Sequence, residues 1–143
     1  RTWRPIREAK TGGLDLWGLD FADETHAWAV GDKGAIFHSA DGGRSWSRQA
    51  SPVEHTLMDV DFIDTRRGWA VGFARDQAGS SLVLWTRDGG ATWEVQSRVE
   101  TEELRALFVL DERHAWALGA QQRRSDEDGS QKILRYEVRE LER

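Results

Sequence analysis

Short stretches of apolar residues alternate with polar turn residues along this chain. Residues that favour turns interrupt the apolar stretches roughly every 8–12 positions. Aromatic and β-branched residues gather in these stretches, as in Trp28-Ala29-Val30 and Trp69-Ala70-Val71. Residues of this type suit the pleated, half-buried surface of a sheet. The pattern therefore predicts a series of short β-strands and no substantial helix.

The strands belong to a unit that occurs three times. Each copy has an Asp five residues before a Trp, at Asp23 and Trp28, Asp64 and Trp69, and Asp111 and Trp116. The Trp residues are 41 and 47 positions apart. Units of this length that contain four short strands are typical of β-propeller blades. We predict an all-β fold, a β-propeller of four-stranded antiparallel blades, of which about three are present.

The aligned units place the blades at approximately 14–49, 57–97 and 104–140 of one propeller segment that covers 1–143. The predicted first strands are 14–21, 57–62 and 104–109, the third strands 35–39, 82–86 and 132–136, and the fourth strands 46–49 and 93–96. The last strand of the third unit is expected to be degenerate or absent. A stray outer strand is predicted at 1–8, because Arg1-Thr2-Trp3 matches the end of a fourth-strand motif. We expect either a piece of a larger propeller, with flanking blades missing, or a chain that self-associates.

A second motif precedes the fourth strand of the first two units. Its residues are Ser39, Asp41, Gly43 and Trp46 in the first copy and Thr86, Asp88, Gly90 and Trp93 in the second. The Asp carboxylate can accept N–H bonds within its own turn, and glycine adopts the positive φ that such turns need. The Trp ring can be buried against the turn while its N–H bonds a carbonyl. Because the motif recurs at matched positions, we interpret these residues as structural Asp-box turns and not as a catalytic or metal site.

Composition narrows the classes of function. The formal net charge is −5, with 25 acidic against 20 basic residues, whereas nucleic-acid-binding domains are usually basic. No apolar stretch approaches the roughly 20 residues of a membrane helix. Cysteine is absent, which excludes disulfides and thiolate metal sites. His26 and His114 occupy matched positions of the repeat and are expected to be framework residues. We expect no catalytic residue, metal, cofactor, transmembrane segment or nucleic-acid partner.

The loops between the second and third strands vary most among the units. Trp28 and Trp46 are 18 positions apart, but Trp69 and Trp93 are 24 apart, and the extra residues fall within 72–81. Variable loops on a constant scaffold commonly carry function. We predict that these loops contact a protein partner through Arg75, Asp76, Gln121, Gln122, Arg123, Arg124, Asp126 and Glu127. Long solvated loops with no partner would show the same polar composition.

The strand that ends in Trp-Ala-Val-Gly and the Asp-box that follows it together resemble the Ycf48-like repeats of photosystem II assembly and stability factors. They are also similar to the wider group of Asp-box, or bacterial neuraminidase (BNR), repeats. The resemblance covers nearly the whole chain and is stronger in its first two units. It implies a seven-bladed propeller, often exported to the periplasm or beyond, that acts as a non-enzymatic assembly scaffold. The partner of such a scaffold is a protein that the sequence does not identify.

A fragment of an Asp-box glycoside hydrolase, such as a sialidase, is the alternative. Sialidases resemble this chain in their Asp-boxes, but catalysis needs an Arg cluster, a Tyr nucleophile with a Glu, and an acid Asp. The sole tyrosine is Tyr136, which lies in the degenerate third unit with only Glu137 beside it. We therefore favour a binding scaffold over an enzyme. A structural domain appended to another protein is a third possibility.

Overall fold

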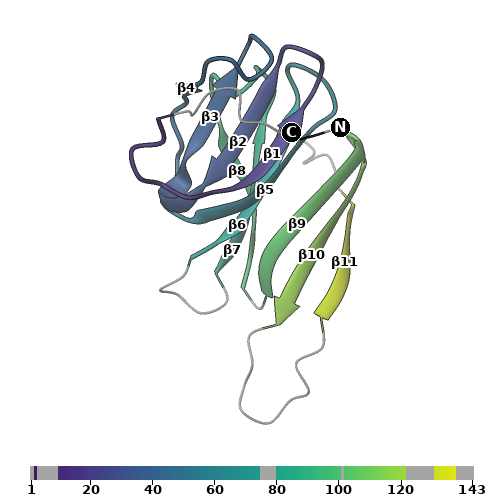
Figure 1. Cartoon of the computed structure of the whole chain (residues 1–143). Coiled ribbons are helices and arrows are strands. Elements are labelled where there is room, and N and C mark those ends of the chain that lie inside the picture. The colour runs from purple at the N-terminus through teal and green to yellow at the C-terminus, as the bar shows by residue number, and fades with distance from the viewer. Residues whose placement is uncertain (1, 3–9, 75–79, 101, 122–130, 138–143) are drawn as a thin grey trace.

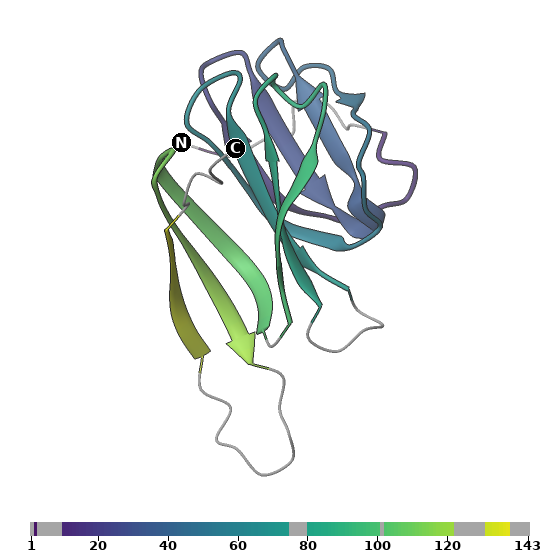
Figure 2. The ribbon, with the colours of Figure 1, turned by 180° about the vertical axis from the view of Figure 1, so that it is seen from behind.

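The chain forms three antiparallel β-sheets, and the second sheet lies between the first and the third (Figures 1 and 2). The computed structural model describes residues 2, 10–74, 80–100, 102–121 and 131–137. Among these residues, two sheets have four strands each and the third has three. In each sheet the strands follow one another in chain order, as in the blades of a propeller. The predicted all-β fold of propeller-type blades is confirmed.

The strands of the first sheet are β1 (Leu16–Phe21), β2 (Ala27–Gly31), β3 (Ile36–Ser39) and β4 (Ser47–Arg48). Those of the second are β5 (Thr56–Phe62), β6 (Gly68–Phe73), β7 (Ser81–Thr86) and β8 (Glu94–Val99). The third sheet contains β9 (Glu102–Asp111), β10 (His114–Gln121) and β11 (Gln131–Glu137). Within each sheet, every strand pairs antiparallel with the next strand along the chain.

The observed strands depart from the predicted bounds in several places, among them β1, which begins at Leu16, and β8, which continues to Val99. β4 is shorter than predicted, because Trp46 belongs to the preceding turn, where its indole N–H bonds the Gly43 carbonyl. β9 is longer, because its pairing with β10 continues to Asp111 and His114. A short 3₁₀ turn, η1 (Asp32–Gly34), joins β2 to β3 and was not predicted. Of the stray strand predicted at 1–8, only Thr2 is among the described residues.

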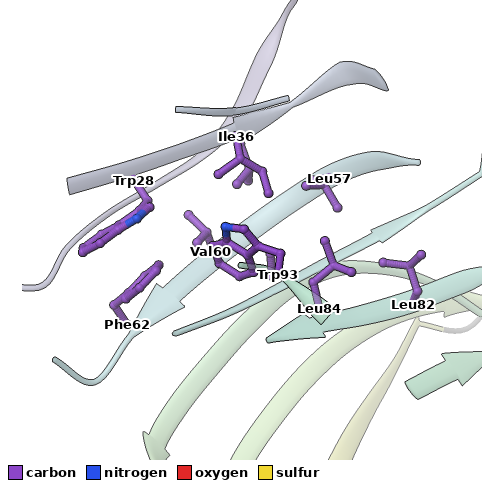
Figure 3. Close-up of a cluster of buried hydrophobic side chains, with 10 residues drawn as sticks. Trp28, Ile36, Leu57, Val60, Phe62, Leu82, Leu84 and Trp93 are labelled. Atoms are coloured by element: carbon purple, nitrogen blue, oxygen red, sulfur yellow. The ribbon is translucent and has the colours of Figure 1, made fainter. Parts of the chain in front are cut away.

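The largest apolar cluster lies between the first and second sheets (Figure 3). Trp28 stacks on Phe62 with ring centroids 3.6 Å apart, and Trp93 meets Phe62 edge-on at 5.8 Å. Pairs of aromatic rings in such geometry add to the gain from burial alone. The other members of the cluster are Val30, Ile36, Leu57, Val60, Ala70, Leu82 and Leu84. Alternate residues of a strand point to the same face of its sheet. Residues of this kind from the facing strands meet in this cluster and hold the two blades together.

The contact between the second and third sheets has smaller apolar clusters among the residues whose side chains are described. Two small clusters lie there, one with Trp69, Val109 and Ala115 and the other with Val71, Leu104 and Ala117. Val109 takes the repeat position that Phe62 has in the second sheet, so the stack of Phe62 on Trp28 has no counterpart between Val109 and Trp69. Within the described part of the chain, no helix is long and apolar enough to cross a membrane.

Candidate functional site

The first Asp-box turn uses its carboxylate entirely within the turn. Asp41 Oδ1 accepts the backbone N–H of Ser45 at 2.8 Å, and Oδ2 accepts the Ser45 hydroxyl at 2.6 Å. The Ser39 hydroxyl donates to Asp41 Oδ1 at 2.9 Å and accepts the N–H of Gly43 at 2.8 Å. The Ser45 bonds, its hydroxyl first, lower the pKa of Asp41 to about 2. The carboxylate therefore acts as an ionised acceptor that holds the turn.

The second Asp-box turn repeats this arrangement. Asp88 accepts the N–H and the hydroxyl of Thr92 at 2.9 and 2.6 Å, and Thr86 donates to Asp88 at 2.8 Å while accepting the N–H of Gly90 at 2.9 Å. The Thr92 hydroxyl is the main cause of the lowered pKa of Asp88. Gly43 and Gly90 have φ of 82° and 86°, in the left-handed region that glycine favours. All eight predicted Asp-box residues therefore lie in or beside these two turns.

The two Asp-box tryptophans have different partners. Trp46 Nε1 donates to the Gly43 carbonyl of its own turn at 3.1 Å. Trp93 Nε1 instead donates to the Oε1 atom of Gln49 at 3.2 Å, across the contact between the first and second sheets. The difference arises because Gln49 follows β4 and lies directly against Gly90 of the second turn. Only the second turn has a preceding blade among the described residues to pack against.

The second Asp-box turn fastens two blades together. The Gly89 carbonyl accepts Trp28 Nε1 at 3.1 Å and Gln49 Nε2 at 2.9 Å, and both donors belong to the first blade. In the second blade the matched residues Trp69 and Gln96 bond each other directly, with Trp69 Nε1 3.2 Å from Gln96 Oε1. The sequence analysis did not identify Gln49 and Gln96 as links, although each lies three residues after an Asp-box Trp. That shared spacing is the signal that identifies them.

Carboxylates on the innermost strands form a second set of links between blades. Asp20 Oδ2 accepts the backbone N–H of Phe62 at 2.7 Å, and Asp61 Oδ2 accepts that of Val109 at 2.6 Å. Asp59 Oδ2 accepts the N–H of Leu107 at 2.8 Å. Burial raises the pKa of Asp59 and of Asp61. These side chains join one inner strand to the next, and the sequence analysis missed them, although Asp20 and Asp61 align in the repeat.

Most of the predicted partner-contact residues lie outside the described part of the chain. These are Arg75, Asp76, Gln122, Arg123, Arg124, Asp126 and Glu127, whereas Gln121 is the last residue of β10. The strand ends that flank the two loops are Phe73, Ser81, Gln121 and Gln131. These ends lie together at one end of the sheets, and the hairpin turns that join β3 to β4 and β7 to β8 lie at the other (Figure 1).

Polar side chains hold the backbone at the end of the sheets where the loops emerge. Asp32 Oδ1 accepts Trp17 Nε1 at 2.9 Å and the Thr56 hydroxyl at 3.3 Å. The Ser81 hydroxyl, at the start of β7, accepts the backbone N–H of Leu104 at 3.1 Å. Arg105 lies over the ring of Phe73 at 5.4 Å. The strand ends that carry the loops are thus cross-linked between neighbouring blades.

No metal site of three or more ligands is formed by the described residues. No group of three His, Asp or Glu side chains that could hold a metal ion occurs among them. His26 and His114 each contact the Asp of their own turn, with Nδ1 3.0 Å from Asp23 Oδ2 and 2.9 Å from Asp111 Oδ1. Tyr136 is paired with Ala115 in the ladder between β10 and β11.

Comparisons with known proteins agree with this geometry. Residues 45–120 match the family described as "Photosynthesis system II assembly factor YCF48". The chain is 34% identical over 67 residues to the photosystem II stability/assembly factor HCF136 of Cyanidioschyzon merolae, and 31% identical over 70 residues to that of Arabidopsis thaliana. These alignments cover 46% and 48% of this chain but only 15% and 17% of the relatives.

A solved structure described as "YCF48 bound to D1 peptide" has the same fold. It superposes with a TM-score of 0.64 at 23% identity, over 84% of this chain and 40% of that chain. The chain thus spans less than half the length of each of these proteins.

Proposed function

This chain belongs to the photosynthesis system II assembly factor YCF48 family, and we propose that it is a non-enzymatic scaffold that binds a peptide segment of a protein partner. The observation that carries the proposal is the family match over residues 45–120. The relatives are assembly factors by name, and a solved structure of the same fold holds a D1 peptide. Assembly of a larger complex is the role that these relatives suggest for this chain.

The peptide is proposed to bind at the end of the sheets where the long loops emerge. At the opposite end, Asp41 and Asp88 are occupied by bonds within their own turns. The loops within 72–81 and 119–131 differ in length from blade to blade, while the strands that carry them keep their register. A fixed frame with variable loops suits recognition of a partner. The arginines of these loops can pair with carboxylates of a peptide.

The test is a titration of a fluorescent D1 peptide with the chain, followed by fluorescence anisotropy. In the test variant Arg75, Arg123 and Arg124 are replaced by Ala. The matched control replaces Arg44, Arg66 and Arg113, which are exposed on the hairpin turns at the other end. We expect the test variant to lose about tenfold or more in affinity, because charge-assisted contacts are removed. The control variant should bind like the unmodified chain.

Two results would count against the proposal. Equal affinity of both variants and the unmodified chain would move the peptide away from the long loops. Absence of any saturable binding of the D1 peptide, together with a pull-down that retains no partner, would remove the scaffold function for this chain.

A further inference from the structure

A row of aromatic rings leads from the turn before β2 into the contact between the first and second blades. The His38 ring lies 4.7 Å from the Trp28 ring and 5.9 Å from the His26 ring, with interplanar angles of 30° and 19°. Trp28 in turn stacks on Phe62 of the second blade (Figure 3). Strands of both blades are among the described residues, so the two sides of this contact are both seen.

The pairing of β2 with β3 explains why His38 belongs to this contact. His38 lies directly opposite Trp28 in the ladder, and residues opposite each other share one face of the sheet. Trp28 is fully buried on the face that packs against the second blade. The equivalent of His38 in the second blade is Trp85, which packs against the apolar cluster of Trp69. The first blade therefore has a titratable ring where the second has an uncharged one.

One ring nitrogen of His38 is buried without a partner. Nε2 is shielded from solvent and has no hydrogen-bond partner among the described residues. A neutral imidazole can keep a lone pair on Nε2, but the protonated ring has an N–H at both nitrogens. A charged donor that is buried without an acceptor is costly. Burial, and next the neighbouring His26, lower the pKa of His38. The closed contact therefore disfavours the proton.

The described groups around His38 do not compensate a positive charge on its ring. The turn before β2 presents His26, which would repel that charge and whose Nδ1 contacts Asp23 Oδ2 at 3.0 Å. β4 places Ser47 opposite His38, and the Ser47 hydroxyl donates to the His38 carbonyl at 3.4 Å. The second blade contributes the uncharged ring of Phe62 to the same row. The nearest carboxylate on this side, that of Asp23, is thus already held by His26.

We propose that His38 makes the contact between the first and second blades sensitive to pH, so that acidification loosens it. When the contact opens, the ring meets water and takes a proton near its ordinary pKa of about 6.5, whereas the closed contact excludes the proton. The closed contact therefore has its full stability above about pH 6.5 and loses stability as the pH falls below that value. This property belongs to the frame of the molecule and does not depend on peptide binding.

The test follows exchange of the Trp28 indole N–H with solvent by NMR between pH 7 and pH 5. This N–H donates to the Gly89 carbonyl of the second blade, so the contact must open before it exchanges. His38→Phe keeps a ring that can stack on Trp28 and removes the titrating nitrogen. Comparing the two chains at each pH cancels the intrinsic pH dependence of exchange. We expect the rate in the unmodified chain, relative to the variant, to rise about tenfold from pH 7 to pH 5.

The matched control is His114→Phe, which changes a histidine at a turn of the third blade. The rate in the unmodified chain relative to this control should stay constant over the same pH range. Titration of the His38 ring by NMR in the unmodified chain is a second measurement, which does not require any variant to fold, and it should give a pKa below 6.5. A constant ratio for His38→Phe, an equal rise for His114→Phe, or a His38 pKa at or above 6.5 would overturn the proposal.

Discussion

At the scale of single residues, Gly43 and Gly90 occupy equivalent positions of the two Asp-box turns, so the effects of replacing each by Ala can be compared directly. Both have φ near the left-handed minimum, at 82° and 86°, so Ala at either position costs about 1–2 kcal/mol of strain. A Cβ on Gly43 would meet only ordinary contacts at 3.6 Å or more, whereas one on Gly90 would lie 2.0 Å from Gln49 Oε1. We expect Gly90→Ala to lower the free energy of unfolding by about 1–3 kcal/mol more than Gly43→Ala, because Gln49 must release its partners. Urea denaturation of both variants measures the difference.

The contact between Gln49 and the second turn explains that difference, so a third variant tests it. Gln49→Met removes the acceptor of Trp93 Nε1 and one of the two donors to the Gly89 carbonyl. In the Gln49→Met variant, Gly90→Ala should lower the free energy of unfolding by no more than Gly43→Ala lowers it in the unmodified chain. An undiminished excess cost would show that the extra destabilisation by Gly90→Ala has another source.

At the scale of strands, the inner carboxylates make stability depend on pH. Burial raises the pKa of Asp61 above its unfolded value of about 3.9, so the folded chain binds this proton more tightly than the unfolded chain. The stability that protonated Asp61 contributes to the folded chain is complete below the unfolded pKa of about 3.9, and it is lost as pH rises through the raised pKa of the folded state. Asp61→Asn keeps an oxygen that can accept the Val109 N–H. We expect its stability relative to the unmodified chain to increase between about pH 4 and pH 7.

Asp41→Asn is a control for which the opposite pH dependence of stability is expected, because hydrogen bonds lower the pKa of Asp41 to about 2. Its stabilising contribution is complete above the unfolded pKa and is lost as pH falls toward about 2. This variant should be less stable than the unmodified chain near neutral pH and should approach it in acid. Urea midpoints over the pH range measure both trends, and parallel pH profiles of the two variants would contradict the assignment.

The strand pattern could be predicted from sequence because it depends on local alternation and turn residues. Asp-Gly-Gly turns depend on bonds within five residues, so their chemistry is also local. The links through Gln49 and Asp61 could not be predicted in the same way, because they join residues 44 and 48 positions apart. Repeat alignment marks these residues, but only the packing of blades shows their partners. The proposed partner loops remain a prediction from their length and composition.

At the scale of the whole molecule, the two contacts between blades differ in aromatic packing, because Phe62 stacks on Trp28 whereas Val109 has the same repeat position beside Trp69. Among the residues whose side chains the structure describes, ten form the buried cluster between the first and second sheets, and three form each of the two clusters beside the third sheet. In repeat proteins stability is approximately a sum over units and their neighbouring contacts. We therefore expect the third blade to open before the other two. Hydrogen exchange, at concentrations where the chain is monomeric, should be faster for the Ala117 amide than for its repeat equivalent, Ala70.

Matched truncations test whether the third blade opens as a separate unit. Leu104 and Leu57 hold equivalent repeat positions and are both fully buried, so each change to Ala should cost about 2–5 kcal/mol. Leu104→Ala should accelerate exchange in β10 while leaving β2 nearly unchanged, because its contacts lie beside the third sheet. Leu57→Ala should accelerate exchange in β2 and β6 together, because it lies in the cluster that joins them. If Leu104→Ala accelerated exchange equally in all three sheets, the chain would unfold as one unit. Opening of the third blade first would leave the first two blades, with the larger cluster, as the stable part of the molecule.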